Sequence, residues 1–175
     1  VGEIRDFETA EIGVKVALTG HLVLSTLHTN DAPSSVSRML NMGIEPFLVA
    51  SSVNLIAAQR LLRKLCKDCR ASIDVPEQVL IVLGVPPEDV GNYNVMKGKG
   101  CGTCNNTGYK GRIAAYEIMF TTDELSEFVL NGASTLELKR EAIRQGMRTL
   151  RMSALMKLAE GQTSIEELVR ATAPD

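Results

Sequence analysis

Four cysteines, arranged as two C-x-x-C pairs, constrain the fold more than any other feature of this sequence. The pairs are Cys66/Cys69 and Cys101/Cys104, and the chain has no other cysteine. Two thiolates separated by two residues can hold one side of a tetrahedral metal ion, and two such pairs complete a closed site of four sulfur ligands. The spacing therefore predicts a structural zinc ion with no open coordination position for catalysis.

Two other interpretations of the cysteines stay open on the residues alone. The thiols can be buried or joined in disulfides, although disulfides are unusual in a cytosolic protein. A redox C-x-x-C pair is disfavoured because neither pair lies in a thioredoxin-like βαβ context. Nearby glycines and lysines favour the metal, since they bring backbone N–H groups and positive charge close to the sulfurs. These residues are Gly98, Gly100, Gly102, Gly108, Lys64, Lys67, Lys97 and Lys99.

The composition argues against two classes of protein. Hydrophobic residues make up 45% of the chain, which is enough to form a core. The net charge of −2 and the pI of about 5.8 argue against a nucleic-acid-binding protein, which would need a basic face. No apolar run approaches the roughly 20 residues that a membrane-spanning helix needs.

Hydrophobic periodicity and turn residues predict an α/β chain with a helical tail. The near-continuous apolar run at 21–28 is typical of a strand buried on both faces of a parallel sheet. Asp31 is expected to cap a helix that has Pro33 in its first turn. Other helices are expected over 7–18, 46–59 and 77–83, and another strand over 111–120. Three S/T-x-x-E capping boxes predict helix starts at Thr121/Glu124, Ser134/Glu137 and Thr163/Glu166.

Glu3 and the two histidines are the candidate chemical groups outside the cysteines. His21 begins the predicted strand and His28 ends it, so His28 is expected at the ligand-binding edge of a parallel sheet. If Val1 and Gly2 end a neighbouring strand, Glu3 emerges at the same edge. The simpler alternative also stays open, in which Glu3 is solvated and His28 hydrogen-bonds the turn that follows it. Neither of the common phosphate-binding glycine motifs occurs in the chain.

Three stretches of the sequence resemble the secretion ATPase superfamily, the hexameric motors of type II secretion and type IV pilus assembly. "VGEIRDFETAEIGVKVALTGHLVLSTLHTNDA" is similar to its Walker B and histidine-box region. "LCKDC", followed by "GCGTCNNTGYKGRIAAYEI", resembles the tetracysteine zinc segment of the PilB-like and GspE-like branches. "GMRTLRMSALMKLAEGQTSIEELVRAT" is similar to their tail, so the resemblance covers nearly the whole chain.

The resemblance implies a fold and a division of the chain. It implies an α/β fold that is the C-terminal part of a RecA-like P-loop NTPase domain. Residues 1–65 would belong to the ATPase core, 66–110 to the zinc-binding segment, and 111–175 to a strand and a helical lobe. The Walker A loop, the aspartate box and the N-terminal domains would lie in a larger parent protein, so this chain alone is expected to be inactive.

The resemblance also implies roles for individual residues. Glu3 would be the Walker B glutamate that acts near Mg²⁺ and the attacking water, and His28 would sense the γ-phosphate of ATP. His21 would support the strand, and Arg5 and Asp6 would orient Glu3. ATP and Mg²⁺ would bind in the parent protein, while the four cysteines would hold Zn²⁺.

The implied partners are five more copies of the parent and a membrane platform protein. The ring would lie on the cytoplasmic face of the inner membrane, peripheral to it, and the zinc segment could contact the platform. No nucleic-acid partner is expected. The residues leave a second class open, a non-enzymatic zinc-binding interaction module, and the tail favours pilus assembly over secretion only slightly.

Overall fold

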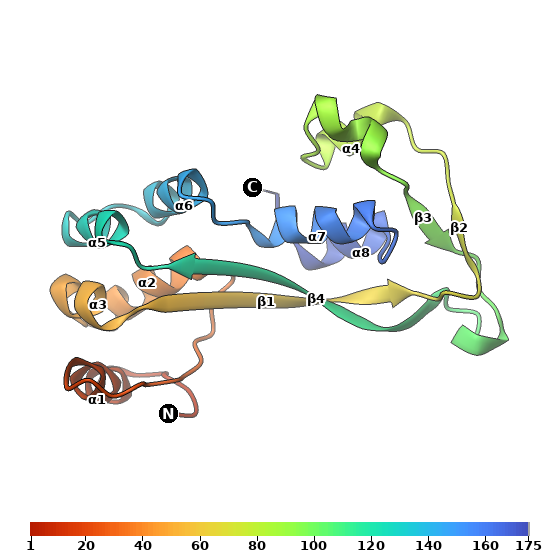
Figure 1. Ribbon diagram of the computed structural model, residues 1–175. Helices are drawn as coiled ribbons and strands as arrows, with labels where there is room; N and C mark the ends of the chain where they lie inside the picture. The colour runs from red at the N-terminus through yellow and green to blue at the C-terminus, as the bar shows by residue number, and fades with distance from the viewer. Residues whose placement is uncertain (175) are drawn as a thin grey trace. The chain divides into compact units, whose positions relative to one another are not determined.

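The computed structural model describes residues 1–174, which form two units. Unit 1 comprises Val1–Ala58 and Glu117–Met147, and unit 2 comprises Gln59–Tyr116 and the described residues from Arg148 onward. Each unit therefore combines two stretches that are far apart in the sequence. Two long strands contribute residues to both units, β1 (Leu55–Leu65) and β4 (Tyr109–Phe120), and they pair in a two-stranded sheet. Their arrows run in opposite directions (Figure 1).

Unit 1 is a helical layer packed against one end of β4. Its core is formed by apolar side chains such as Val36, Met39, Val49, Met119 and Leu138. Burial of these side chains is the main source of stability for such a layer. The helices are α1 (Phe7–Leu18), α2 (Ala32–Asn41), α3 (Pro46–Ser52), α5 (Asp123–Leu130) and α6 (Thr135–Arg144).

Two helix starts in unit 1 agree with the predictions from the sequence. The predicted helix over 7–18 is α1, and its first turn is capped by Asp6, which accepts from the Thr9 amide at 2.8 Å. Asp31 caps α2 by accepting from the Ser34 amide at 2.9 Å, and proline occupies its first turn. Each cap satisfies an amide that has no partner inside the helix.

Two predicted elements were wrong. Residues 21–28 are extended but form no assigned strand, and Leu22 and Leu24 are 82% and 73% exposed, because the residues that the structure describes supply neighbours on one side only. The helix expected over 46–59 ends at Ser52, because residues from Leu55 onward pair with β4 instead. Pairing with a distant strand has overridden the local helical composition.

The helix starts predicted from capping boxes were correct in one case and displaced by one residue in the other two. Ser134 and Glu137 form the predicted box at the start of α6. Thr122 caps α5 instead of Thr121, whose amide donates a hydrogen bond to the Asn54 carbonyl. Ser164 caps α8 (Ile165–Ala171) instead of Thr163, whose buried hydroxyl donates to the Arg63 carbonyl.

Unit 2 contains the cysteines and the two C-terminal helices. Strands β2 (Arg70–Ser72) and β3 (Met96–Gly98) pair antiparallel, with Arg70 opposite Gly98 and Ser72 opposite Met96. The helical elements of this unit are α4 (Glu77–Val82), η1 (Pro87–Asn92), η2 (Gly102–Cys104), α7 (Leu150–Ala159) and α8. The short helix and the strand predicted from the sequence correspond to α4 and β4. Within residues 1–174, the structure has no helix that is both long and apolar enough to span a bilayer.

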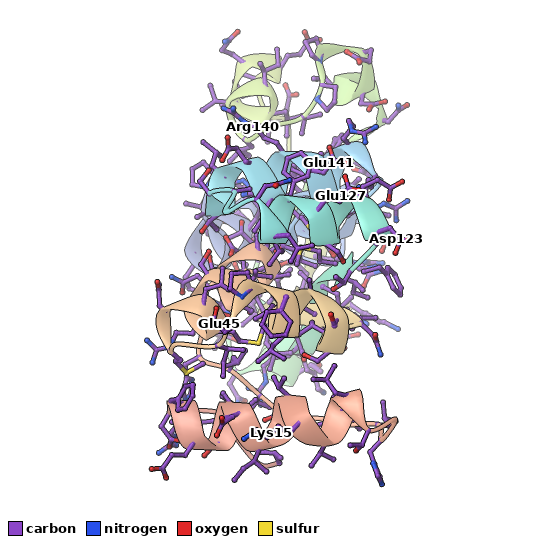
Figure 2. All side chains as sticks on the ribbon, turned by 90° about the vertical axis from the view of Figure 1, so that its left-hand side faces the viewer. Lys15, Glu45, Asp123, Glu127, Arg140 and Glu141 are labelled. Atoms are coloured by element: carbon purple, nitrogen blue, oxygen red, sulfur yellow. The ribbon has the colours of Figure 1, made fainter. Side chains whose placement is uncertain are left out.

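The two units differ in charge. Unit 1 contains twelve acidic and six basic residues, whereas the described part of unit 2 contains eight acidic and thirteen basic residues. Figure 2 views the helices of unit 1 and labels Lys15, Glu45, Asp123, Glu127, Arg140 and Glu141. The near-neutral net charge of the chain thus conceals a basic unit that contains the cysteines.

Glu167 is the central buried charge of unit 2. Its carboxylate is fully buried and accepts hydrogen bonds from the Arg63 amide, the Arg63 guanidinium and the Arg170 guanidinium, all between 2.7 and 2.9 Å. The hydrogen bonds from Arg170 and Arg63 outweigh the loss of hydration and lower the pKa of Glu167 to about 2. This carboxylate joins α8 to β1.

We expect Glu167→Gln to lower the free energy of unfolding at pH 7 by about 2–3 kcal/mol, because strong charge-assisted hydrogen bonds are lost. The folded pKa is below the unfolded one, so the stabilisation is complete above about pH 5 and is lost as the pH falls towards 2. Urea unfolding between pH 7 and pH 2.5 measures both effects. The exposed neighbour Glu166 provides the control, and Glu166→Gln should cost less than about 1 kcal/mol. Equal effects of the two variants would contradict this account.

Candidate functional site

Two extended segments of unit 1 lie side by side and run in the same direction. The Val1 amino nitrogen donates to the Leu24 carbonyl at 3.1 Å, and the Ile4 amide donates to the Thr26 carbonyl at 2.9 Å. The Thr26 hydroxyl also donates to the Gly2 carbonyl at 2.9 Å. These bonds fix residues 1–4 against residues 24–26, so Glu3 and the residues that follow Thr26 lie near the same edge.

Glu3 and His28 meet at that edge. The Glu3 Oε1 atom lies 2.5 Å from His28 Nε2, which is ion-pair range, although the contact lacks the angles of a hydrogen bond. The Glu3 side chain is 21% exposed, whereas the His28 side chain is 86% exposed. The carboxylate is therefore held inside the edge, and the imidazole faces solvent, where a ligand could reach it.

Arg5 holds the other oxygen of Glu3. The Arg5 guanidinium lies 2.5 Å from Glu3 Oε2. The hydrogen bond from Arg5 lowers the pKa of Glu3, partial burial opposes it, and the charges of Arg5 and His28 add to the lowering. Glu3 is therefore an anion at neutral pH. A carboxylate in this state can accept a proton from water or orient a water molecule.

The two remaining residues of the predicted site lie elsewhere in unit 1. The His21 ring contacts Thr19, the residue that caps the C-terminal end of α1, and the Thr19 hydroxyl lies 3.1 Å from the ring Nδ1. The Asp6 carboxylate accepts a hydrogen bond from the Thr9 amide in the first turn of α1. The structure thus groups Glu3, Arg5 and His28, and the roles of all five residues stay predictions.

One buried acid near this site was missed from the sequence. Glu117 lies on β4 and is 1% exposed, and its Oε1 accepts from the Ala32 amide at 2.7 Å. The signal was the alternation of inward- and outward-facing residues along β4, which places Ala115, Glu117 and Met119 on the same, buried face. A period of two along a strand places every second side chain on one face, so an acid on the apolar face was detectable.

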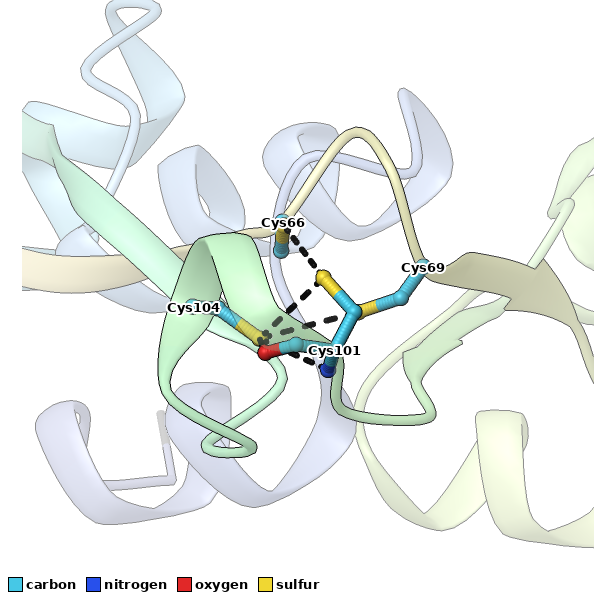
Figure 3. Close-up of side chains that lie close together, drawn as sticks. All are labelled: Cys66, Cys69, Cys101 and Cys104. Atoms are coloured by element: carbon cyan, nitrogen blue, oxygen red, sulfur yellow. Dashed lines mark hydrogen bonds between the residues drawn. The ribbon is translucent and has the colours of Figure 1, made fainter.

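The four cysteines of unit 2 form one cluster (Figure 3). Cys66 follows β1, Cys69 precedes β2, Cys101 precedes the short helix η2, and Cys104 is its last residue. All four Sγ atoms lie within 4.8 Å of one another. The Sγ–Sγ distances are 3.8 Å for Cys66–Cys101, 3.9 Å for Cys69–Cys104 and 3.7 Å for Cys101–Cys104.

These distances have the dimensions of a tetrathiolate metal site. A zinc–sulfur bond of about 2.3 Å in a tetrahedron places neighbouring sulfurs about 3.8 Å apart. The sulfurs are too far apart for disulfides, in which the bond is about 2.05 Å, and all four thiols are free. The cluster can therefore hold one tetrahedral metal ion without rearrangement.

The backbone around the cluster supplies hydrogen-bond donors to sulfur. The amides of Cys101 and Gly108 each donate to Cys104 Sγ at 3.3 Å. Loss of hydration raises the pKa of Cys104, but these amides and the neighbouring thiols outweigh it and lower the pKa to about 6. Burial raises the pKa of Cys69 to about 11. Donors of this kind stabilise a thiolate, which is the form that binds metal.

Close backbone contact explains two of the glycines. A Cβ atom built on Gly98 would lie 2.2 Å from the Gly108 carbonyl oxygen, and Gly108 has a φ of +77°. A side chain at either position would push the two segments apart. The close approach brings the Gly108 amide to the sulfur of Cys104.

Comparison with solved structures shows an α/β fold of a known kind. The chain is similar to the pilus retraction motor PilT with bound ADP, at 22% identity and a TM-score of 0.66, over 100% of this chain and 39% of that one. It is also similar to the Legionella pneumophila ATPase DotB, at 20% identity and a TM-score of 0.62, over 96% of this chain and 36% of that one. At these identities the likeness shows the fold alone.

The chain belongs to the Type II/IV secretion system protein family, whose family model matches residues 1–170. It is 62% identical over 176 aligned residues to the type IV pilus assembly ATPase PilB of Myxococcus xanthus, covering 100% of this chain and 31% of that protein. It is 44% identical to the type II secretion system protein E of Aeromonas hydrophila, covering 100% of this chain and 34% of that protein. The chain thus spans about a third of the length of these relatives.

Proposed function

We propose that this chain is the C-terminal part of the RecA-like catalytic domain of a hexameric motor ATPase that powers type IV pilus assembly or type II secretion. The observation that carries the proposal is the contact between Glu3 and His28, which lie 25 residues apart and meet at 2.5 Å. Relatives that match the whole chain are named as ATPases of pilus assembly or as type II secretion proteins. The higher identity to PilB favours pilus assembly.

The charge and exposure of the site residues support the roles that the family resemblance implies for them. Glu3, an anion at neutral pH, orients the water that attacks the γ-phosphate of ATP. His28 is exposed beside it and donates from its ring to a γ-phosphate oxygen. Arg5 fixes the Glu3 carboxylate by holding its second oxygen. Bound Mg²⁺ would neutralise phosphate charge in the full-length protein.

Asp6 and His21 would support this arrangement from a distance. Asp6 caps α1, which begins at Phe7 shortly after Glu3, and so limits the movement of the Glu3 segment. His21 contacts Thr19 at the end of α1, where the segment that leads to His28 begins. Neither side chain needs to touch the nucleotide in this proposal.

Nucleotide turnover by the full-length protein tests the proposed function. The full-length protein should bind Mg-ATP and release phosphate, and this chain alone should do neither, because it has no phosphate-binding glycine motif. Isothermal titration and phosphate release measure the two properties. A full-length protein that binds no nucleotide would favour the second class, a non-enzymatic zinc-binding interaction module, which the cysteine cluster supports.

The cysteine cluster would hold one structural Zn²⁺ ion in this protein. The sulfur spacings fit a tetrahedral zinc site, and all four positions would be filled by Cys66, Cys69, Cys101 and Cys104. The ion would join the end of β1 to the η2 turn, which are 35 residues apart in sequence. No catalytic step passes through it, since no open coordination position would remain.

The partners proposed for the full-length protein are its own copies in a hexameric ring and a platform protein of the inner membrane, with the ring peripheral to the cytoplasmic face. The tetracysteine lobe, residues 59–70 and 97–112, supports contact with an acidic partner because it contains nine basic residues and one acidic residue. Light scattering by the full-length protein measures its mass in solution and so tests the proposed hexameric ring. Co-purification with the platform protein, repeated with Lys67 and Lys99 changed to glutamate, tests the contact. Unchanged co-purification would contradict it.

A further inference from the structure

Glu117 is a buried carboxylate that the proposed roles leave unused. It is 1% exposed on β4, between Ala115 and Met119 on the apolar face of the strand. Its Oε1 atom accepts from the Ala32 amide at 2.7 Å, across 85 residues of sequence. Burying an acid is unfavourable unless its hydrogen bonds compensate, so this contact calls for an explanation beyond packing.

The contact fixes the start of α2. The first amides of a helix have no partner within the helix, and Ala32 is the first residue of α2. Glu117 satisfies the Ala32 amide, and Asp31 satisfies the Ser34 amide at 2.9 Å. Two carboxylates thus hold the positive end of the helix dipole in one place.

His28 lies between two anchored points of the chain. On one side, the Thr26 carbonyl accepts from the Ile4 amide at 2.9 Å. On the other side, Glu117 holds Ala32, and the intervening turn is braced by a 2.7 Å hydrogen bond between Thr29 and Ser35. The His28 side chain is 86% exposed, so packing of the ring itself does not place it. Apart from the contact with Glu3, the position of the ring therefore depends on the backbone anchors on either side of it.

We propose that Glu117 is a positioning residue that holds His28 beside Glu3 by fixing the Ala32 amide. This inference rests on the proposed function, in which His28 contacts the γ-phosphate. Loss of the Glu117 acceptor would leave a buried amide unpaired and release the turn that carries His28. The ring would then be displaced from Glu3 while the nucleotide-binding surface outside this turn is kept.

The first test compares two variants of the full-length protein. Glu117→Leu removes the acceptor and should lower kcat for ATP hydrolysis about 10- to 100-fold, as small misplacements of reacting groups do. KM for ATP should stay within about threefold of the wild-type value, because the substitution changes the position of a reacting group and leaves the binding of ATP largely unchanged. Glu117→Gln keeps an acceptor for the Ala32 amide and should stay within about threefold of wild type. Equal loss in both variants would overturn the proposal.

The second test asks whether Glu117 acts through His28. In a His28→Ala background, Glu117→Leu should change kcat by less than about twofold, because the group that it positions is already absent. Glu141→Leu is the matched control, since it removes another buried carboxylate of unit 1 whose partners are Arg144 and Gln145. The effect of Glu141→Leu on kcat should be the same in the wild-type and His28→Ala backgrounds. Independent effects of Glu117→Leu and His28→Ala would contradict the proposal.

A third readout separates this inference from the proposed function. In the full-length protein, the ring NMR signals of His21 and His28 can be assigned by substituting each of these two histidines in turn. Glu117→Leu should shift the His28 ring signals and leave those of His21 unchanged. A full-length protein without ATP turnover would end the proposed function, whereas unshifted His28 signals would end the positioning role.

Discussion

Glu3→Gln in the full-length protein should lower ATP turnover by about 10²- to 10⁴-fold, the range typical for loss of a positioned acid or base. Glutamine has nearly the shape of glutamate but no charge, so it cannot accept a proton from the attacking water. The Arg5 guanidinium, which now lies 2.5 Å from a carboxylate oxygen, would face a neutral amide. Nucleotide binding should be largely kept, because the substitution removes no donor to phosphate.

Single-turnover phosphate release and isothermal titration measure the two effects separately. Glu8→Gln is the matched control, because it makes the same change in charge at an exposed position in the first turn of α1. This control should retain wild-type turnover. A Glu3→Gln protein with turnover within about threefold of wild type would remove Glu3 from the catalytic role.

Cys101→Ser should remove the metal ion from the protein and destabilise unit 2. The Cys101 Sγ atom lies 3.7 Å from that of Cys104 in its own C-x-x-C pair and 3.8 Å from that of Cys66 in the other pair, so its loss opens the cluster between the two pairs. A serine hydroxyl does not bind zinc as a thiolate does. Because structural zinc contributes directly to folding free energy, the thermal midpoint should fall by on the order of 10 °C.

Metal analysis by mass spectrometry and thermal unfolding check this prediction together. The wild-type protein should contain one zinc ion per chain, and a chelator should reproduce the thermal effect of the substitution. Thr103→Ser changes an exposed residue of the same η2 turn, and it should keep both the zinc and the thermal midpoint. Wild-type protein free of zinc, with an unchanged midpoint after chelation, would show that the thiols alone form the cluster.

Local signals in the sequence predicted the helices that depend on few neighbours. Phe7–Leu18 and the start of α2 were predicted because Asp31, Pro33 and the apolar spacing act within one or two turns. The cysteine cluster was predictable for a similar reason, since metal-ligand spacing is a short-range pattern. Its four sulfurs do converge.

Long-range pairing explains what the sequence did not predict. Residues 55–65 have the composition of a helix, and only β4, more than 40 residues further on, makes them a strand. The apolar run at 21–28 suggested cover on both faces, which the described residues do not provide. Glu117 was missed because its partner, the Ala32 amide, lies 85 residues away in the sequence.

The sequence predicted the closeness of Glu3 and His28 only on the condition that Val1 and Gly2 end a strand beside the one that ends at His28, and it did not predict their chemistry. The strand-end argument requires only that residues 1–4 run beside residues 24–26, which the hydrogen bonds of Ile4 and Val1 now show. An acid next to an imidazole can be a purely structural ion pair or part of a catalytic site, and which of the two it is depends on whether a substrate binds against it. The assignment of roles therefore rests on family membership and on the exposure of His28.

A crystal structure of the full-length protein with Mg²⁺ and a non-hydrolysable ATP analogue tests the central claim most directly. The account predicts that the His28 ring lies within about 3.2 Å of a γ-phosphate oxygen and that the Glu3 carboxylate holds a water in line with the γ-phosphorus. A γ-phosphate bound away from both side chains, with the Glu3–His28 contact unchanged, would show that this contact is only structural.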